Sequence, residues 1–100
     1  MNYRVIYSPT FRGCIAAQVD YLREQHVPDD IIENWFNRLF DRLDDLNEWP
    51  RRYPVDARMT AQIGIETRKL VFGRYVITYH VDDHDHSVQL LAMVHGARRK

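Results

Sequence analysis

The chain has 100 residues and no net formal charge at pH 7; 45% of its residues are hydrophobic and 28% are charged. This length fits one domain over residues 1–100, and the composition is that of an ordinary globular protein. No run of about 18 apolar residues occurs, so we expect neither a transmembrane helix nor a membrane partner. Because the N-terminus lacks a signal-peptide layout and Cys14 is the single cysteine, a cytoplasmic location is expected.

The charges are distributed unevenly along the sequence. Residues 20–48 contain nine acidic residues against three arginines, whereas residues 51–74 contain six basic residues against two acidic ones. Three further cations, Arg98, Arg99 and Lys100, end the chain. We therefore expect an acidic and a basic part of the surface, and the basic part could attract an acidic peptide or a nucleic acid.

The first half of the chain predicts a strand and a helical hairpin. Alternating residues indicate a strand over residues 2–8, and Ser8 or Thr10 then starts a helix that must end before Pro28. The short break around this proline, followed by a second helical pattern, predicts an antiparallel pair of helices.

The second helix has the clearest pattern in the sequence. It is expected from Asp29 to about Leu46, because acidic residues favour a helix start and apolar residues then recur at helical spacing. Arg38 and Arg42 are among the polar residues that fill the other face of this helix.

The second half predicts a loop and three strands. Pro50 and Pro54 bracket the loop, and regular structure is expected to resume near Ile63. Strand-like runs cover residues 67–72, 75–81 and 87–94, with a tight turn at 73–74 and a polar turn at 82–86. The order predicts an α+β fold: an N-terminal strand, an antiparallel helical hairpin and a three-stranded antiparallel meander, with one sheet packed on the two helices.

The polar turn DDHDH combines carboxylates with imidazoles, and both groups are metal ligands. Neighbouring residues of a turn point in different directions, however, and turns favour Asp for its local hydrogen bonds. No second ligand pair at a useful spacing accompanies them. The sequence therefore predicts a solvated turn, no metal site and no cofactor.

Cations also gather around the predicted sheet. Arg68 begins an otherwise apolar strand, Arg74 lies in the following turn, and His95, Arg98 and Arg99 follow the last strand. If the strands bring these residues together, they form a cationic concavity with one titratable group, suited to a phosphate or a carboxylate. The register of the strands is not determined by the sequence, so a rim of solvated cations remains the alternative.

With its elements in this order, the chain resembles the RelE/ParE superfamily of toxins from bacterial type II toxin–antitoxin systems. The resemblance covers nearly the full chain and consists of YRVIYSP, the helical hairpin, the loop entry from Leu46 to Pro50, R-x-L from Arg68, Y-x-I-x-Y-x-V from Tyr75, and the ending VHGARR. It implies the fold above, inhibition of bacterial growth, and silencing by a cognate antitoxin whose C-terminal segment wraps the toxin.

The resemblance implies one of two activities. RelE-like members are endoribonucleases that cut mRNA, commonly in the ribosome, whereas ParE-like members bind and poison DNA gyrase. RelE-like members often have an arginine where this chain has Val76, and they are rich in lysine along the preceding strand. Many of them also carry a catalytic Tyr or His near the C-terminus, where this chain has only His95. The neutral net charge and the ending from His95 to Arg99 favour the ParE-like branch.

The two branches assign the same residues differently. In the ParE-like interpretation none is catalytic, and the expected target-binding residues are Arg68, Arg74, His95, Arg98 and Arg99. In the ribonuclease alternative, His95 is the general acid or base, while Arg68 and Arg98 hold the phosphate. A detoxified relative that serves only as an interaction module is the third interpretation.

An antitoxin site is expected from the apolar residues of the helices, which exceed what a two-layer domain of this size hides easily. Phe11, Ile31, Trp49 and Tyr53 are expected to line a groove for an amphipathic antitoxin segment. Because the helical surface is acidic, an acidic segment should favour the basic sheet side. The sequence does not decide between a monomer and a homodimer.

Overall fold

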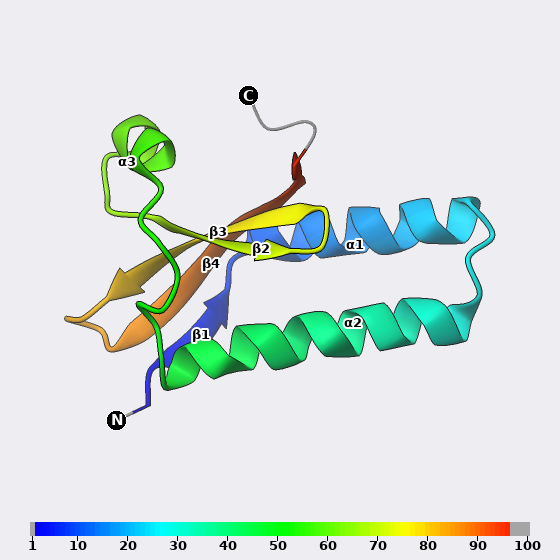
Figure 1. The fold of residues 1–100 in the computed structure, drawn as a ribbon, viewed down its shortest axis with the longest axis horizontal. Coiled ribbons are helices and arrows are strands. Elements are labelled where there is room, and N and C mark those ends of the chain that lie inside the picture. Colours follow the sequence, from blue (N-terminus) through cyan, green and yellow to red (C-terminus); the bar gives the residue numbers. More distant parts are fainter. Residues whose placement is uncertain (1, 97–100) are drawn as a thin grey trace.

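The computed structural model describes residues 2–96 and places a helical hairpin against a mixed four-stranded sheet (Figure 1). The elements in chain order are β1 (Arg4–Tyr7), α1 (Pro9–Glu24), α2 (Asp29–Asp44), the 3₁₀ turn η1 (Asp45–Asn47), α3 (Ala57–Ile63), β2 (Arg68–Phe72), β3 (Tyr75–Asp82) and β4 (Ser87–His95). The sheet has the order β1-β4-β3-β2; β1 is parallel to β4, and β2, β3 and β4 form an antiparallel meander. The predicted α+β architecture is confirmed.

The two long helices begin and end where local chemistry predicts. The side chain of Ser8 accepts a hydrogen bond from the backbone N–H of Phe11 (3.1 Å), which caps α1, and Pro9 occupies its first turn. α1 ends ahead of Pro28, and His26 then adopts a left-handed conformation with φ of 60°. Neither these helices nor any other in residues 2–96 is long and apolar enough to cross a membrane.

The core lies between the hairpin and one side of the sheet. Leu70 of β2 pairs with Ile77 of β3, which pairs with Met93 of β4, and all three are buried. Since side chains alternate along a strand, this register aligns one apolar face toward the helices. The core cluster comprises Phe11, Ile15, Leu39, Leu43, Leu46, Leu70, Phe72, Ile77, Tyr79, Val81, Val88, Leu90 and Met93.

One element differs from the prediction, because α3 occupies residues where only a loop was expected. Asp56 caps it by accepting a hydrogen bond from the N–H of Met59 (3.2 Å), and Gly64 ends it with a φ of 90°. None of its seven residues is buried, so no apolar stripe marks the helix in the sequence. The cap and the terminal glycine were the available signals. Figure 1 places α3 on the side of the sheet away from α1 and α2.

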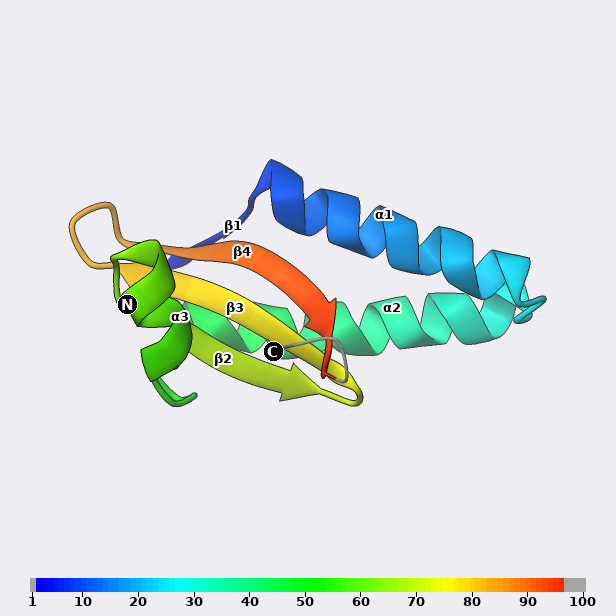
Figure 2. The ribbon, with the colours of Figure 1, turned by 90° about the horizontal axis from the view of Figure 1, so that it is seen from above.

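The hairpin is longer than the sheet that it covers. Figures 1 and 2 show the far ends of α1 and α2, with the connection between them, extending beyond the β2–β3 turn. The helical surfaces near this turn therefore face a space that no strand fills, and this region holds the larger of the two crevices described below.

Candidate functional site

Arg68, the first residue of β2, is bound to the loop that precedes it. Its Nη1 donates to the carbonyl oxygens of Tyr53 (2.8 Å) and Arg51 (3.3 Å), and its Nη2 lies 3.4 Å from Glu66 Oε1. The Arg68 side chain is 15% exposed. The guanidinium is thus directed at the protein's own backbone and holds the loop against the edge of the sheet.

Tyr79 holds the same loop from the core. Its hydroxyl donates to the carbonyl oxygen of Pro50 (2.8 Å), and its side chain is completely buried. Burial is the main cause that raises the pKa of Tyr79 to about 12, and the Tyr53 backbone and the nearby Arg68 charge act in the opposite direction. Arg68 of the R-x-L pattern and Tyr79 of the Y-x-I-x-Y-x-V pattern therefore have a structural role. Both hold carbonyl groups of the loop in place.

The strand register separates Arg68 from His95. Arg68 pairs with Tyr79, whereas His95 pairs with Tyr75, so the two residues share a face of the sheet. The two pairs are about 13 Å apart along the strands, and β2 and β4 lie on opposite sides of β3. Two predicted residues fall outside the described part of the chain: Arg98 and Arg99. The described members of the predicted cationic set are thus divided, with Arg68 at one end of the sheet and Arg74 and His95 at the other.

Arg74, Tyr75 and His95 meet at the end of the sheet opposite Arg68. The rings of Tyr75 and His95 are 5.7 Å apart and nearly perpendicular, at 85°. The N–H of Gly96 donates to the carbonyl oxygen of Arg74 (2.6 Å), and a Cβ at position 96 would lie only 3.2 Å from that oxygen. Glycine therefore permits the close approach of β4 to the β2–β3 turn, which places His95 beside Arg74.

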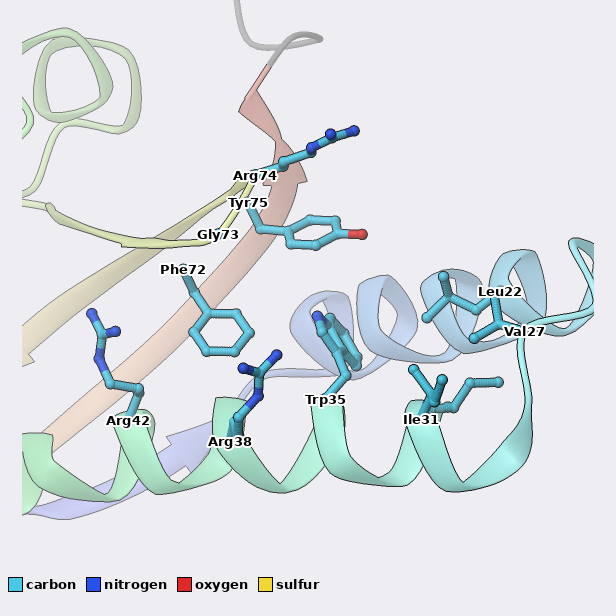
Figure 3. Close-up of a pocket in the computed structure, with 11 residues that line it drawn as sticks. Leu22, Val27, Ile31, Trp35, Arg38, Arg42, Phe72, Gly73, Arg74 and Tyr75 are labelled. Carbon is cyan, nitrogen blue, oxygen red and sulfur yellow. The ribbon is translucent and has the colours of Figure 1, made fainter.

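A groove of about 400 Å³ lies between the projecting ends of α1 and α2 and the β2–β3 turn (Figure 3). Its apolar lining consists of Leu22, Val27, Ile31, Ile32, Trp35 and Phe72. Trp35 packs edge-on against the rings of Phe72 (6.3 Å) and Tyr75 (5.7 Å), which closes the groove toward the sheet. Ile31 stays 55% exposed, so the groove presents uncovered apolar surface to solvent.

Three arginines line this groove, two from α2 and one from the β2–β3 turn: Arg38, Arg42 and Arg74. Arg42 is held in place, since its Nε donates to the Tyr53 hydroxyl and its Nη2 to the Val71 carbonyl oxygen, each at 3.3 Å. Its guanidinium also lies over the rings of Tyr53 (5.8 Å) and Phe72 (6.0 Å). No carboxylate is among the described residues that line the groove, so its charge is positive.

Arg38 and Arg42 lie on the flank of α2 that borders the groove, where Arg38 is exposed and Arg42 is half-buried. Ile31, Trp35, Arg38 and Arg42 follow one another at intervals of four, three and four residues, which places them on one stripe of the helix. This spacing was the signal that sequence reasoning missed, because the stripe changes from apolar to cationic along its length.

The net charge of each section of the sequence does not predict which cations pair with acidic residues. Several cations of the basic section already have acidic partners: Arg51 with Asp83 (2.6 Å), Arg52 with Asp45 (3.9 Å) and Arg68 with Glu66 (3.4 Å). By contrast, none of the three groove arginines forms an ion pair with a carboxylate of residues 2–96. The unneutralised cations thus come partly from the helix that is most acidic in the sequence.

The residues predicted to contact an antitoxin do not form one surface. Ile31 lines the groove, and Tyr53 borders it through Arg42. Trp49 is 63% exposed but is not part of the groove lining. Phe11 is completely buried in the core, so its predicted place in an exposed groove needs correction. It lies beneath a smaller apolar crevice of about 280 Å³ that Phe36 and Phe40 also line.

The carboxylates of the turn at residues 82–86 form hydrogen bonds and ion pairs within the protein. Asp82 accepts a hydrogen bond from the N–H of Asp85 (3.0 Å), and Asp85 pairs with Arg4 (2.9 Å). Asp83 accepts from Arg51, and this hydrogen bond is the main cause that holds the pKa of Asp83 below its usual value. Across residues 2–96, no three His, Cys, Asp or Glu side chains are grouped so that they could hold a metal ion.

Comparisons with known proteins agree with this architecture. One chain of the toxin–antitoxin complex RelBE2 from Mycobacterium tuberculosis has a similar fold, with a TM-score of 0.59 and 22% identity over 95% of this chain and 99% of that one. No curated protein sequence matches the chain. A family model described as the ParE toxin of the type II toxin–antitoxin system parDE matches residues 5–100. The chain therefore belongs to the ParE toxin family of type II toxin–antitoxin systems.

Proposed function

We propose that this ParE-family toxin stops bacterial growth by binding DNA gyrase, and that a cognate antitoxin silences it. Membership of the ParE family supports a toxin, and the similar chain of RelBE2 was solved in a toxin–antitoxin complex. The observation that favours binding over ribonuclease chemistry is the separation of Arg68 from His95 at opposite ends of the sheet.

Cleavage of RNA through a ribose 2′-hydroxyl requires an acid, a base and cations around one phosphate. In the ribonuclease alternative Arg68 would hold that phosphate, but its guanidinium donates to the Tyr53 and Arg51 carbonyl oxygens. A phosphate beside His95 would also be too far from Arg68 for contact, given about 13 Å along the strands alone. These positions suit a recognition surface better than a nuclease centre.

The proposed gyrase-contacting surface is the end of the sheet formed by Arg74, Tyr75 and His95. Arg74 is exposed and His95 is half-buried, so both cationic and aromatic groups are accessible there. Arg98 and Arg99, which the sequence also predicts to contact the target, follow His95 closely in the sequence but lie outside the described residues. Arginine and aromatic side chains are the types that most often carry the binding energy of protein interfaces.

The test in cells is to induce the gene without an antitoxin and to follow thymidine and amino-acid incorporation over the first minutes. We expect DNA synthesis to fall first while amino-acid incorporation continues and the cells filament. An immediate fall in amino-acid incorporation would instead support the ribonuclease alternative. If the folded protein affected neither process, the chain would be a detoxified relative.

The test in solution is inhibition of supercoiling by purified DNA gyrase. We expect the double variant Arg74→Ala/His95→Ala to inhibit at least tenfold more weakly than the unchanged chain, because interface energy concentrates in few residues. Arg58→Ala is the matched control, since Arg58 lies exposed on α3, away from this end of the sheet. Equal inhibition by the double variant would exclude the assigned surface.

A further inference from the structure

We propose that a row of three valines on the open face of the sheet, Val71, Val76 and Val94, is the apolar anchor of the contact with DNA gyrase. Lys69 and Arg74, beside this valine row, select a protein surface that carries carboxylates. The open face is the side of the sheet that faces away from α1 and α2. That the partner is gyrase rests on the proposed function, whereas the exposed row is a feature of the fold itself.

The three valines lie side by side on neighbouring strands. Val71 of β2 pairs with Val76 of β3, which in turn pairs with Val94 of β4. Leu70 and Met93 immediately precede two of them and are buried in the core. Because successive side chains of a strand point to opposite sides, the valines face away from the hairpin. With strands about 4.8 Å apart, the row is about 10 Å wide.

No element among residues 2–96 covers this row. The long helices pack on the other face, and Figures 1 and 2 place α3 toward the end of the sheet that lies away from the β2–β3 turn. Val71 is 55% exposed and Val94 is 40% exposed, with Val76 nearly buried between them. One exposed valine is ordinary in a strand, but three neighbours make a continuous apolar surface, and such a surface marks a protein contact.

The rim of the valine row is cationic. Lys69 lies one row further along the open face, beside Thr78 and Ala92, and Arg74 lies in the turn that follows β2. Neither cation forms an ion pair with a carboxylate of residues 2–96. Figure 3 shows Arg74 extending away from α2. Charge complementarity therefore calls for a partner surface with an apolar centre and carboxylates around it.

The valine row adjoins the surface already proposed to contact gyrase. Val94 immediately precedes His95, and Val76 immediately follows Tyr75. The two sets point to opposite sides of the sheet, because neighbouring residues of a strand alternate. A partner that encloses the end of the sheet therefore meets aromatic groups on one side and valines on the other, with Arg74 between them. Apolar anchors supply binding energy, and the charges at the rim orient the partner.

The partner surface is the gyrase protein and not the DNA that gyrase holds. Contacts with a nucleic acid are dominated by hydrogen bonds and charge attraction to phosphates. Valine side chains offer neither, and the open face has only two cations beside the row, Lys69 and Arg74. An apolar protein surface gains from covering the valines at about 25 cal/mol per Å².

The first test is protection of introduced cysteines from alkylation. Cys14 is the one cysteine of the chain, so Cys14→Ala gives a background in which Val71→Cys, Val94→Cys or Val55→Cys is labelled alone by iodoacetamide. Val55 is the matched control, because it is 42% exposed but pairs with Arg68 at the opposite end of the sheet. With saturating gyrase, we expect alkylation to slow about tenfold at positions 71 and 94 and to stay unchanged at position 55.

The second test is inhibition of supercoiling by a variant that keeps the fold. Threonine has the shape of valine and the same preference for strands, so Val71→Thr/Val94→Thr removes apolar contact area without opening a cavity. Circular dichroism and urea unfolding verify that this variant is folded. We expect it to inhibit gyrase about tenfold more weakly than the unchanged chain, and Val55→Thr to inhibit equally. Lys69→Glu should also weaken inhibition.

The outcomes separate the anchor from the proposed function. If the unchanged chain inhibits gyrase but the cysteines at positions 71 and 94 are not protected, the inference fails and the proposed function stands. Protection by linear DNA without gyrase would assign the row to a nucleic acid. A dimer of the unchanged chain in sedimentation that is lost in Val71→Thr/Val94→Thr would assign it to a second copy; either result overturns the inference. If the unchanged chain neither bound nor inhibited gyrase, the proposed function would fail, and the gyrase anchor with it.

Discussion

Replacement of Arg68 by leucine distinguishes a structural role for this residue from contact with the target. The change removes the 2.8 Å hydrogen bond to the Tyr53 carbonyl oxygen and the longer one to Arg51, while leucine keeps part of the aliphatic packing. A hydrogen bond from a charged donor contributes about 1.5–3 kcal/mol. The contact with Glu66 adds little, because that carboxylate is 55% exposed. We therefore expect the free energy of unfolding to fall by about 2–3 kcal/mol.

Urea unfolding, followed by tryptophan fluorescence, measures this loss as a lower midpoint with an unchanged slope. In thermal unfolding, the same loss corresponds to a Tm lower by about 10–20 °C for a chain of this size. Arg58→Leu is the control and should change the stability by less than about 0.5 kcal/mol. If Arg68→Leu kept full stability but lost gyrase binding, the structural role would be refuted, and Arg68 would be a target-binding residue, as its sequence position first indicated.

Four further predictions concern stability and use the same unfolding experiment. Because the pKa of Tyr79 is raised from 10.0 to about 12 in the fold, its neutral form is stabilised. We expect full stability below pH 10, a loss of about 3 kcal/mol between pH 10 and 12, and no such loss in Tyr79→Phe. Gly13→Ala should raise stability by about 0.5–1 kcal/mol, since Gly13 lies within α1 with nothing near its missing Cβ. Gly96→Ala should lower stability by about 1 kcal/mol, because the new Cβ would press on the Arg74 carbonyl oxygen. His26→Gly should raise it by about 0.5 kcal/mol by relieving the left-handed φ, and a decrease would mean that the imidazole makes a stabilising contact.

Most of the fold could be predicted from local pattern, because each long element buries one face. The stripe of α2 and the alternation of buried and exposed residues at the end of β2 follow directly from which side of each element meets the core. α3 was not predicted, because it buries none of its residues and therefore shows neither an apolar period nor a hydrophobic run. Only its capping residues, Asp56 and Gly64, distinguish it from a loop.

The functional residues were harder to predict, because a charged side chain has no pattern that reveals its partners. Arg68 and Arg38 look alike in the sequence, yet one donates to the carbonyl groups of a loop and the other lines an open groove. Residue 68 begins an edge strand beside its loop, whereas residue 38 faces the space beyond the sheet. Their difference arises from neighbours that are far away in the chain.

The sequence by itself determined the long helices, the strands, their order and the family, because capping, periodicity and alternation are local properties of the chain. Tertiary structure alone decided which charges neutralise one another, since Arg51 meets Asp83 only when the loop packs against the β3–β4 turn. It also decided that Arg68 and His95 lie at opposite ends of the sheet, because strand register depends on pairing across the meander. The groove has the same origin: its walls come from the ends of α1 and α2 and from the β2–β3 turn, and they meet only after the hairpin has packed on the sheet.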